Sequence, residues 1–486
     1  MSAISCWNGH KVMNAPALPP AQPPALPPAL PPALPHRHLL AYAAPALALA
    51  MPTLPVYVFL PAYYAQTVGL GLAATGAALM LARVFDVVTD PVVGYLSDRF
   101  PTRWGQRKPW MVLGGMIAAP ALIALVSPPP GAGQMYLALW SLLLYLGWTL
   151  IAVPYTAWGA DLSRDQRERT RITGWREGGM VAGILLAGLL PVLLKAFGAD
   201  QVEPMQSIAW LALMLGGVTL ATLVWMVPEA RPDRNQTSPR PPLRRWHSIL
   251  SLWNNGPFMR LLIAWCINGL ANGLPAATFL LYLDHGLQAD EMTRNGLLFA
   301  YFLAAILALP LWAAAAARWG KPRSWSAAMV VAVLAFAVVP FLAPGDDLAF
   351  LVVCLLTGAA LGADLALPPA MQADVVDFDT WRTGDRRAGI YFALWSMASK
   401  LSLALAVGLG LPLLEALGFT PSVEDGPDPV WPLLAIYAGL PVVLKTAAIV
   451  LIWHHPLTPR RHRAIVSRLA RRQSRRPGQG SANADQ

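Results

Sequence analysis

Apolar runs of 18 or more residues recur along this chain from Leu39 to Trp453. A run of about this length is what an α-helix needs to cross the hydrocarbon core of a bilayer. Charged residues make up only 13% of the chain, whereas soluble domains carry about 25%. Because so few charges cannot cover a water-facing surface, the sequence predicts an all-α integral membrane protein and excludes a soluble enzyme.

Twelve apolar segments can be counted, each close to the roughly 20 residues that a span requires. They lie at 39–61, 69–97, 109–127, 135–160, 177–198, 206–227, 257–284, 293–317, 325–343, 349–373, 388–415 and 431–453. The longest polar interruption follows the sixth segment and is rich in proline, so it is predicted to link two six-helix bundles. We therefore expect a disordered Pro-rich tail at 1–38, an N-terminal bundle at 39–227, a linker at 228–256, a C-terminal bundle at 257–453 and a basic tail at 454–486.

Two short sequence echoes relate the predicted bundles. Arg-Trp-Gly at 103–105, after the second apolar segment, is repeated at 318–320, after the eighth and 215 residues later. Ala-Asp at 160–161, after the fourth segment, is repeated at 373–374, after the tenth and 213 residues later. Two echoes at nearly the same offset indicate a duplicated six-helix unit, whose copies are related by a pseudo-symmetry axis along the membrane normal. This architecture is typical of alternating-access transporters.

The basic residues gather in one set of loops. Of the 36 Lys and Arg residues, 30 lie in the two tails and at 99–108, 161–176, 228–256, 318–324 and 374–387. The opposite loops, at 128–134, 199–205, 285–292, 344–348 and 416–430, contain neither residue type. The positive-inside rule therefore predicts that both termini and the linker lie in the cytoplasm, with the chain in the cytoplasmic (inner) membrane. The net charge of +10 then requires no nucleic acid. The Arg-rich run at 460–476 is expected to lie on anionic lipid, with binding to a partner protein as the alternative.

The residue types that enzymes need are poorly placed here. The three cysteines, Cys6, Cys266 and Cys354, lie far apart, which indicates neither a disulfide framework nor a metal cluster. His454 and His455 have no partner acid or metal-ligand spacing, and no phosphate-binding glycine loop is present. We therefore expect no enzymatic activity, no metal site and no cofactor other than a transported ion.

A stripe of ionisable side chains follows one face of the second apolar segment. Arg83, Asp86 and Asp90 have the spacing i, i+3, i+7, and Thr89 lies close by. An ionisable side chain inside a membrane helix costs at least about 2.5–3.5 kcal/mol on insertion scales, so it marks a candidate functional site. Two carboxylates one turn apart repel, so the pair favours a bound proton, a cation or a fixed positive side chain. The alternative is an internal salt bridge from Arg83 to Asp86 that only helps the helix to insert.

Lys400 is the comparable charge in the eleventh segment. It lies some twelve residues from either end of that segment, roughly 18 Å at 1.5 Å per residue, so it cannot reach the membrane surface. We predict that it faces an aqueous cavity or an acid on another helix. Asp364 in the tenth segment and Lys445 in the twelfth are the remaining isolated charges.

Further charges lie at the cytoplasmic ends of the predicted helices. Asp98, Arg103, Gly105 and Arg107 follow the second segment, where a latch between helices is expected. Simple topogenic charge, the alternative, would account for the arginines but not for Asp98. Arg176, which is followed by Glu177, either faces the central cavity or forms an ion pair at its helix end.

Four motifs together resemble the glycoside–pentoside–hexuronide:cation symporter family of the major facilitator superfamily. They are RVFDVVTDPVVGYLSD at 83–98, RWGQRKPW at 103–110, the run from Pro154-Tyr through Asp161-Leu to Arg167-Glu-Arg-Thr, and the run from Asp374-Val-Val-Asp377 through Thr383-Gly384 and Arg386 to Gly389. The resemblance covers about residues 38 to 455. It implies a Na⁺- or H⁺-coupled symporter with a twelve-helix fold.

The resemblance also implies residue roles. The family's cation-site residues fall here on Asp86, Thr89, Asp90 and Thr149, and the lysine that matches Lys400 lies near that site in melibiose-type members. We assign Arg83 and Lys400 as charge partners. The two acids that grip sugar hydroxyls in melibiose-type members fall on Ala50 and Ala152, so the usual galactoside grip is missing. We assign the substrate cavity to Ala50, Ala152, Arg176, Asn268, Asn272 and Asp364, and the cytoplasmic gate to Asp98, Arg103, Gly105, Arg107, Asp161, Asp374 and Asp377.

The sequence therefore predicts secondary active symport of a sugar or glycoside-like solute with Na⁺ or H⁺. The expected partners are this solute, the coupling cation and the bilayer, and the protein is expected to be a monomer. One alternative is transport of a lysolipid or another amphipathic solute, since relatives of this fold carry lysolipids and the missing acids leave a more apolar cavity. A second alternative is a non-transporting assembly factor or sensor, which would tolerate neutral substitutions at the intramembrane charges.

Overall fold

The computed structural model describes residues 34–100, 102, 104–163, 166–197, 203–229, 255–384, 388–419, 430–457 and 459–474. Most of the predicted Pro-rich tail and of the linker fall outside these residues, as do Arg103 and the side chains of Asp98 and Asp161. All the helices described here belong to the compact unit Pro35–Gln486.

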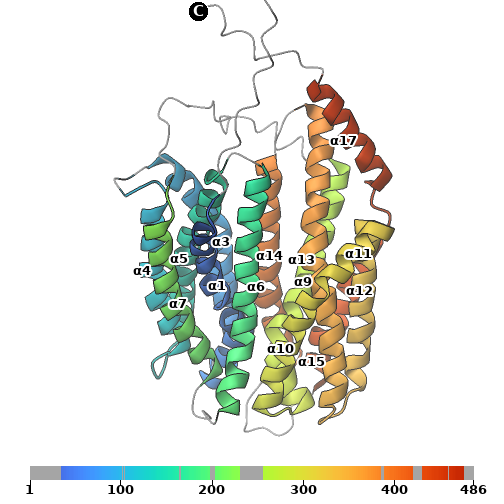
Figure 1. Ribbon diagram of the computed structural model, residues 1–486. Helices are drawn as coiled ribbons and strands as arrows, with labels where there is room; N and C mark the ends of the chain where they lie inside the picture. Colours follow the sequence, from blue (N-terminus) through green and yellow to red (C-terminus); the bar gives the residue numbers. More distant parts are fainter. Residues whose placement is uncertain are drawn as a thin grey trace, which may run out of the picture. The chain divides into compact units, whose positions relative to one another are not determined.

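Twelve helical segments of the described chain are long and apolar enough to cross a membrane, which confirms the predicted fold class. The first half contains one span made of α1 (His36–Ala50), η1 (Pro55–Phe59), α2 (Leu60–Ala62) and η2 (Tyr63–Thr67), then α3 (Leu72–Arg99), α4 (Lys108–Val126), α5 (Gln134–Asp161), α6 (Gln166–Ala196) and α7 (Pro204–Met226). The second half contains α9 (Gly256–Tyr282) with η3 (Leu283–Leu287), α10 (Glu291–Leu307) with α11 (Leu309–Trp319), α12 (Lys321–Val338) with η4 (Val339–Phe341), α13 (Asp347–Thr383), α14 (Ala388–Ala416), and α15 (Val430–Leu434) with η5 (Ala435–Gly439) and α16 (Leu440–Trp453). A final helix, α17 (Pro459–Ser474), follows the last span. Figure 1 shows α1 and α3–α7 beside α9–α13.

Two stretches expected to be loops are helical instead. Helix α13 continues to Thr383, ten residues beyond the predicted end of its apolar segment, and α6 begins at Gln166 rather than near residue 177. The 37 residues of α13 measure roughly 55 Å at 1.5 Å per residue, far more than the bilayer core of about 30 Å. Polarity ends a membrane span but does not end a helix. Helix α13 stops where Gly384 adopts a left-handed conformation, with φ of 80°, and donates its N–H to Thr380 O at 2.9 Å.

Glycine pairs spaced four residues apart bring helices into close contact within each half. In α6, Gly179 and Gly183 lie against the backbone carbonyls of Ala43 and Leu47 in α1, and a Cβ on Gly183 would stand 2.1 Å from the Leu47 oxygen. In α13, Gly358 and Gly362 lie in the same way against Tyr301 and Ala305 of α10. Small residues at this spacing let membrane helices approach to backbone contact. Each half therefore contains at least one seam where no side chain fits between the helices.

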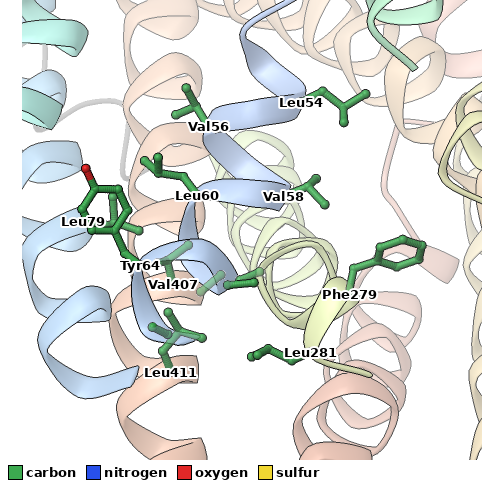
Figure 2. Packing of buried hydrophobic residues seen from close by; sticks show 14 of the residues in the cluster. Leu54, Val56, Val58, Leu60, Tyr64, Leu79, Phe279, Leu281, Val407 and Leu411 are labelled. Carbon is green, nitrogen blue, oxygen red and sulfur yellow. The ribbon is translucent and has the colours of Figure 1, made fainter. Parts of the chain in front are cut away.

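The two halves share an apolar core. Helix α3 packs along α14, α6 packs along α10, and η1 and α2 pack against α9. Figure 2 shows Leu54 and Tyr64 of the first span together with Leu79 of α3, Phe279 of α9 and Leu411 of α14. This cluster removes apolar surface of both halves from water. A second cluster belongs to the C-terminal half alone and reaches Ile465 of α17.

We call the end of the helix bundle next to α17 the α17 side, and the opposite end the far side. Among the described residues, three polar contacts join the halves on the far side. Lys195 of α6 pairs with Glu291 of α10 at 2.6 Å. Gln66 and His285 meet at 3.2 Å between Nε2 atoms. The Glu415 carboxylate of α14 accepts the N–H of Ala73 in the first turn of α3 at 2.6 Å, where the positive end of the helix dipole favours an anion.

Candidate functional site

Two acids, a hydroxyl and an ammonium group meet at the contact between α3, α5 and α14. Asp86 and Asp90 lie one turn apart on α3. The Thr149 hydroxyl of α5 lies 2.8 Å from Asp86 Oδ1 and 2.9 Å from Asp90 Oδ1. From the other half, Lys400 Nζ lies 2.8 Å from Oδ2 of each acid. The lysine therefore bridges both carboxylates, and the bridge crosses from one half of the protein to the other.

The charges in this cluster do not cancel. Two ionised carboxylates and one ammonium leave one negative charge in a site where Asp86 is 6% exposed and Thr149 is 2% exposed. A charge in such surroundings favours binding of a further cation or a proton. The available oxygens, from two carboxylates and a hydroxyl, are donors that hard cations prefer. Across the described chain, no group of three or more His, Cys, Asp or Glu residues is placed to hold a metal ion.

Arg83 completes the stripe on α3 without pairing with Asp86. Its guanidinium stacks over the ring of Tyr57 at 3.8 Å and of Tyr145 at 4.3 Å, and it donates to the Tyr57 hydroxyl. No ion pair within 4.0 Å joins Arg83 to Asp86 in this described region, so the internal salt bridge considered as an alternative is not formed. Cation–π contacts compensate a buried guanidinium without neutralising an acid. Asp86 and Asp90 therefore share only Lys400 as an ion-pair partner among the described residues.

Thr89 is oriented differently from Thr149. Its hydroxyl donates to the backbone carbonyl of Asp86 at 3.0 Å and is 8% exposed. The hydrogen is thus held by the helix itself, as is common for threonine in membrane helices. The described contacts bring Thr149, and not Thr89, to the two carboxylates.

The C-terminal half contains a separate buried polar network. Asp364 accepts from Asn272 Nδ2 at 2.8 Å and from Trp325 Nε1 at 2.5 Å. Lys445 donates to Asn268 at 2.9 Å and to Asn272 at 2.7 Å. Asn268, Asn272 and Asp364, three predicted cavity residues, therefore belong to one network, in which Lys445 joins Asn268 to Asn272. Asn272 is the half-buried member, so it is the one that a solute could reach.

The other predicted cavity residues lie apart from this network. Ala50 is buried, 2% exposed, at the end of α1 against α6, and Ala152 is half-buried in α5. Arg176 pairs with Glu177 at 2.6 Å, but α6 begins ten residues earlier at Gln166, so this ion pair does not lie at a helix end as the alternative expected. None of these three contacts the acid pair in the contacts described.

Predicted gate residues form links on the α17 side. Asp374 pairs with Lys321 at 2.7 Å, and His462 of α17 contacts Asp377 at 3.1 Å. These links tie α12 and α17 to the long extension of α13. Near Gly105, the loop is held by Glu229, whose Oε1 accepts the backbone N–H of Gln106 at 2.7 Å.

Glu229, Tyr57, Tyr145 and Trp325 were not predicted from the sequence as partners of these sites. Arg107 of the same predicted gate is buried and donates to Ser97 Oγ at 3.3 Å. In the sequence, Glu229 is distinguished only as an acid at the start of a basic linker. Its contact with Gln106 could not be predicted, because it depends on the conformation of the loop around Gly105.

A family described as MFS/sugar transport protein matches residues 41–459 of this chain. The match extends over both halves and over every residue of the acid–lysine cluster. The chain belongs to this family. The resemblance to the glycoside–pentoside–hexuronide:cation symporters is thereby confirmed, and the protein is a transporter of the major facilitator superfamily.

Individual relatives are distant but extend over most of the chain. A glucuronide carrier protein homolog of Escherichia coli (strain K12) is 23% identical, over 84% of this chain and 90% of its own length. A sodium-dependent lysophosphatidylcholine symporter of Danio rerio is 23% identical, over 79% of this chain and 78% of its own length. The crystal structure of a D-xylose-proton symporter superposes with a TM-score of 0.64 at 11% identity, covering 87% of this chain and 98% of that one, which shows the shared fold.

Proposed function

We propose that this transporter is a symporter that couples movement of a sugar or glycoside-like solute to Na⁺ or H⁺. The observation that carries the proposal is the bridge from Lys400 to Asp86 and Asp90. Because this bridge crosses the contact between the halves, the charge state of the acids is joined to the way the halves meet. A carrier with alternating access needs such a connection.

The cluster suggests how coupling works. A cation or proton that binds the acid pair competes with Lys400 for the carboxylate oxygens, so the two contacts of the lysine are weakened. The bound ion thereby favours a different arrangement of the halves, by as much as its affinity differs between the two arrangements. Thr149 would supply a third oxygen to Na⁺, whereas a proton would need only the carboxylates.

Orientation and assembly are proposed from the sequence-based expectations. We propose that the α17 side faces the cytoplasm of an inner membrane, because the Arg-rich α17 and the basic residue Lys321 lie on that side. We propose a monomeric carrier, since a single chain supplies every side chain of the cluster.

Proteoliposome uptake of the Asp90→Asn variant tests this function. A screen of sugars and glycosides, with and without Na⁺ and pH gradients, first identifies the solute. Asp90→Asn leaves Asp86 and Lys400 as a neutral pair, so cation-driven accumulation should be lost while the protein still folds. Asp290→Asn, an exposed far-side change that retains a capping side chain, is the matched control. Concentrative uptake by Asp90→Asn with unchanged ion dependence would contradict the proposal.

A second candidate solute class is an amphipathic lipid. It is supported by the sodium-dependent lysophosphatidylcholine symporter among the relatives and by the apolar residues Ala50 and Ala152 at the positions of the sugar-gripping acids. Thermal stabilisation by lysophosphatidylcholine, without stabilisation by any sugar in the same screen, would favour this class.

A further inference from the structure

A cavity of about 400 Å³ lies on the far side, away from the acid–lysine cluster. It is lined by residues of both halves, from η2 and the start of α7 in one half and from α9, η3 and α10 in the other. We call it the far-side cavity. Its volume falls within the roughly 300–1,000 Å³ of small-molecule sites.

The far-side cavity is lined by side chains that suit hydroxyl groups. Asp284 and Arg294 form an ion pair on its wall. Glu203 and Tyr63 add a carboxylate and a phenolic hydroxyl, and Glu203 makes no hydrogen bond that caps α7. Carboxylates accept strongly from hydroxyl donors, and an ion pair offers both donors and acceptors.

Asn295 is the residue that points to a ligand. It lines the cavity and is 5% exposed, yet its carboxamide makes no hydrogen bond with any residue that the structure describes. Its two carboxamide atoms are not among the fully enclosed unpaired atoms of the described residues, so they open into the cavity, where water or a ligand can supply the hydrogen bonds that side-chain amides nearly always make. A carboxamide with free donor and acceptor atoms matches two adjacent hydroxyls of a sugar ring.

We propose that the far-side cavity is a second solute site, which binds the ring of a neutral, hydroxyl-rich pyranoside. The charges argue for a neutral ligand. Arg294 is paired with Asp284 and Glu291 with Lys195, so Glu203 leaves the wall with an unpaired negative charge that disfavours a uronate. The class of solute rests on the proposed symport function, whereas the site rests on its own geometry. The solute would then be selected at the far-side cavity. The central positions of the sugar-gripping acids are occupied by Ala50 and Ala152, which cannot bind hydroxyls.

Saturation-transfer NMR on the full chain in nanodiscs tests the proposal. The probes are the methyl pyranosides of glucose, galactose and xylose, with methyl β-D-glucuronide as the charged comparison. At least one neutral pyranoside should bind, and the glucuronide should bind at least tenfold more weakly. Asn295→Leu should weaken binding of the neutral probe about tenfold or more, and Asp290→Asn should leave it unchanged.

Two further variants test the charge argument and the location of the site. Glu203→Gln, at an exposed position where misfolding is not expected, should bring glucuronide binding closer to that of the neutral probe. Binding should persist in Asp90→Asn, which disables the central cluster. The proposal is overturned if none of the three neutral probes binds, if binding survives Asn295→Leu unchanged, or if Asp90→Asn abolishes it. That last result would place the solute at the central cluster and leave the proposed symport function standing.

Discussion

The Lys400→Met variant tests whether this lysine replaces the coupling cation in the empty carrier. Its ammonium lies 2.8 Å from one oxygen of Asp86 and of Asp90, and its side chain is 26% exposed. At an effective dielectric constant of about 20, each contact corresponds to roughly 6 kcal/mol of Coulomb attraction before desolvation is subtracted. Removing one partner of a buried ion pair costs about 3–5 kcal/mol, and the partial exposure of this lysine favours the lower value.

A loss of about 3 kcal/mol corresponds to a factor of roughly 150. Without Lys400, the empty carrier would have to rearrange with one buried and one half-buried carboxylate that have no ammonium partner, so this step should be slowed by about that factor. Net accumulation requires the empty carrier to return, whereas exchange of labelled for unlabelled solute uses only the loaded carrier. We expect accumulation to fall to the background of empty liposomes and exchange to persist. The cation concentration for half-maximal exchange should also decrease, because the competing ammonium is gone.

Net accumulation and exchange can both be measured on the same proteoliposomes with the solute found in the uptake screen. Lys445→Met is the matched control, since Lys445 is a second intramembrane lysine of the C-terminal half that bonds to two asparagines rather than to acids. It should lower the thermal stability and leave the ratio of accumulation to exchange unchanged. A folded Lys400→Met protein that accumulates solute at the wild-type rate, or that loses exchange together with accumulation, would refute the reasoning.

Three other contacts give predictions that thermal unfolding can check. Arg83→Lys should lower stability by about 1–2 kcal/mol, because an ammonium cannot stack between two rings as a guanidinium does, and an unchanged midpoint would contradict this. Gly183→Leu should cost about 1–3 kcal/mol by separating α6 from α1, whereas Gly178→Ala, at a position with open space, should be nearly neutral. Burial lowers the pKa of His455, outside the last span, below its usual 6.5, so its contribution to stability is present above about pH 6.5 and is lost as the pH falls. His455→Gln should flatten this part of the pH profile, and an equally steep profile would exclude His455 as its source.

Much of the fold can be predicted from sequence because membrane helices follow two simple physical rules. A run of apolar residues long enough to cross the bilayer must satisfy its backbone internally, so the positions of the twelve spans follow from composition alone. The ends of the helices do not follow, because a polar stretch such as 374–383 can continue a helix into water. The additional helical turns of α6 and α13 contain no apolar run that would have predicted them.

The acid pair can be predicted for a similar reason, and its surroundings cannot. The spacing of Asp86 and Asp90 places them on one face of α3 whatever the neighbouring helices do. The partners of Arg83 depend on how spans distant in sequence pack, and aromatic residues such as Tyr57 are common in spans, so they carry no distinguishing signal. Family resemblance, rather than spacing, points to Thr149.

The glycine seams have a mechanical consequence. Backbone-to-backbone packing inside each half is stiff, because close-packed interiors have low compressibility and transmit strain. A force that arises at the contact of α3 with α14 would therefore be transmitted through each half rather than absorbed by it. Breaking or restoring the contact of Lys400 with the acid pair would then shift whole helices, so that the effect would be felt at both ends of the protein.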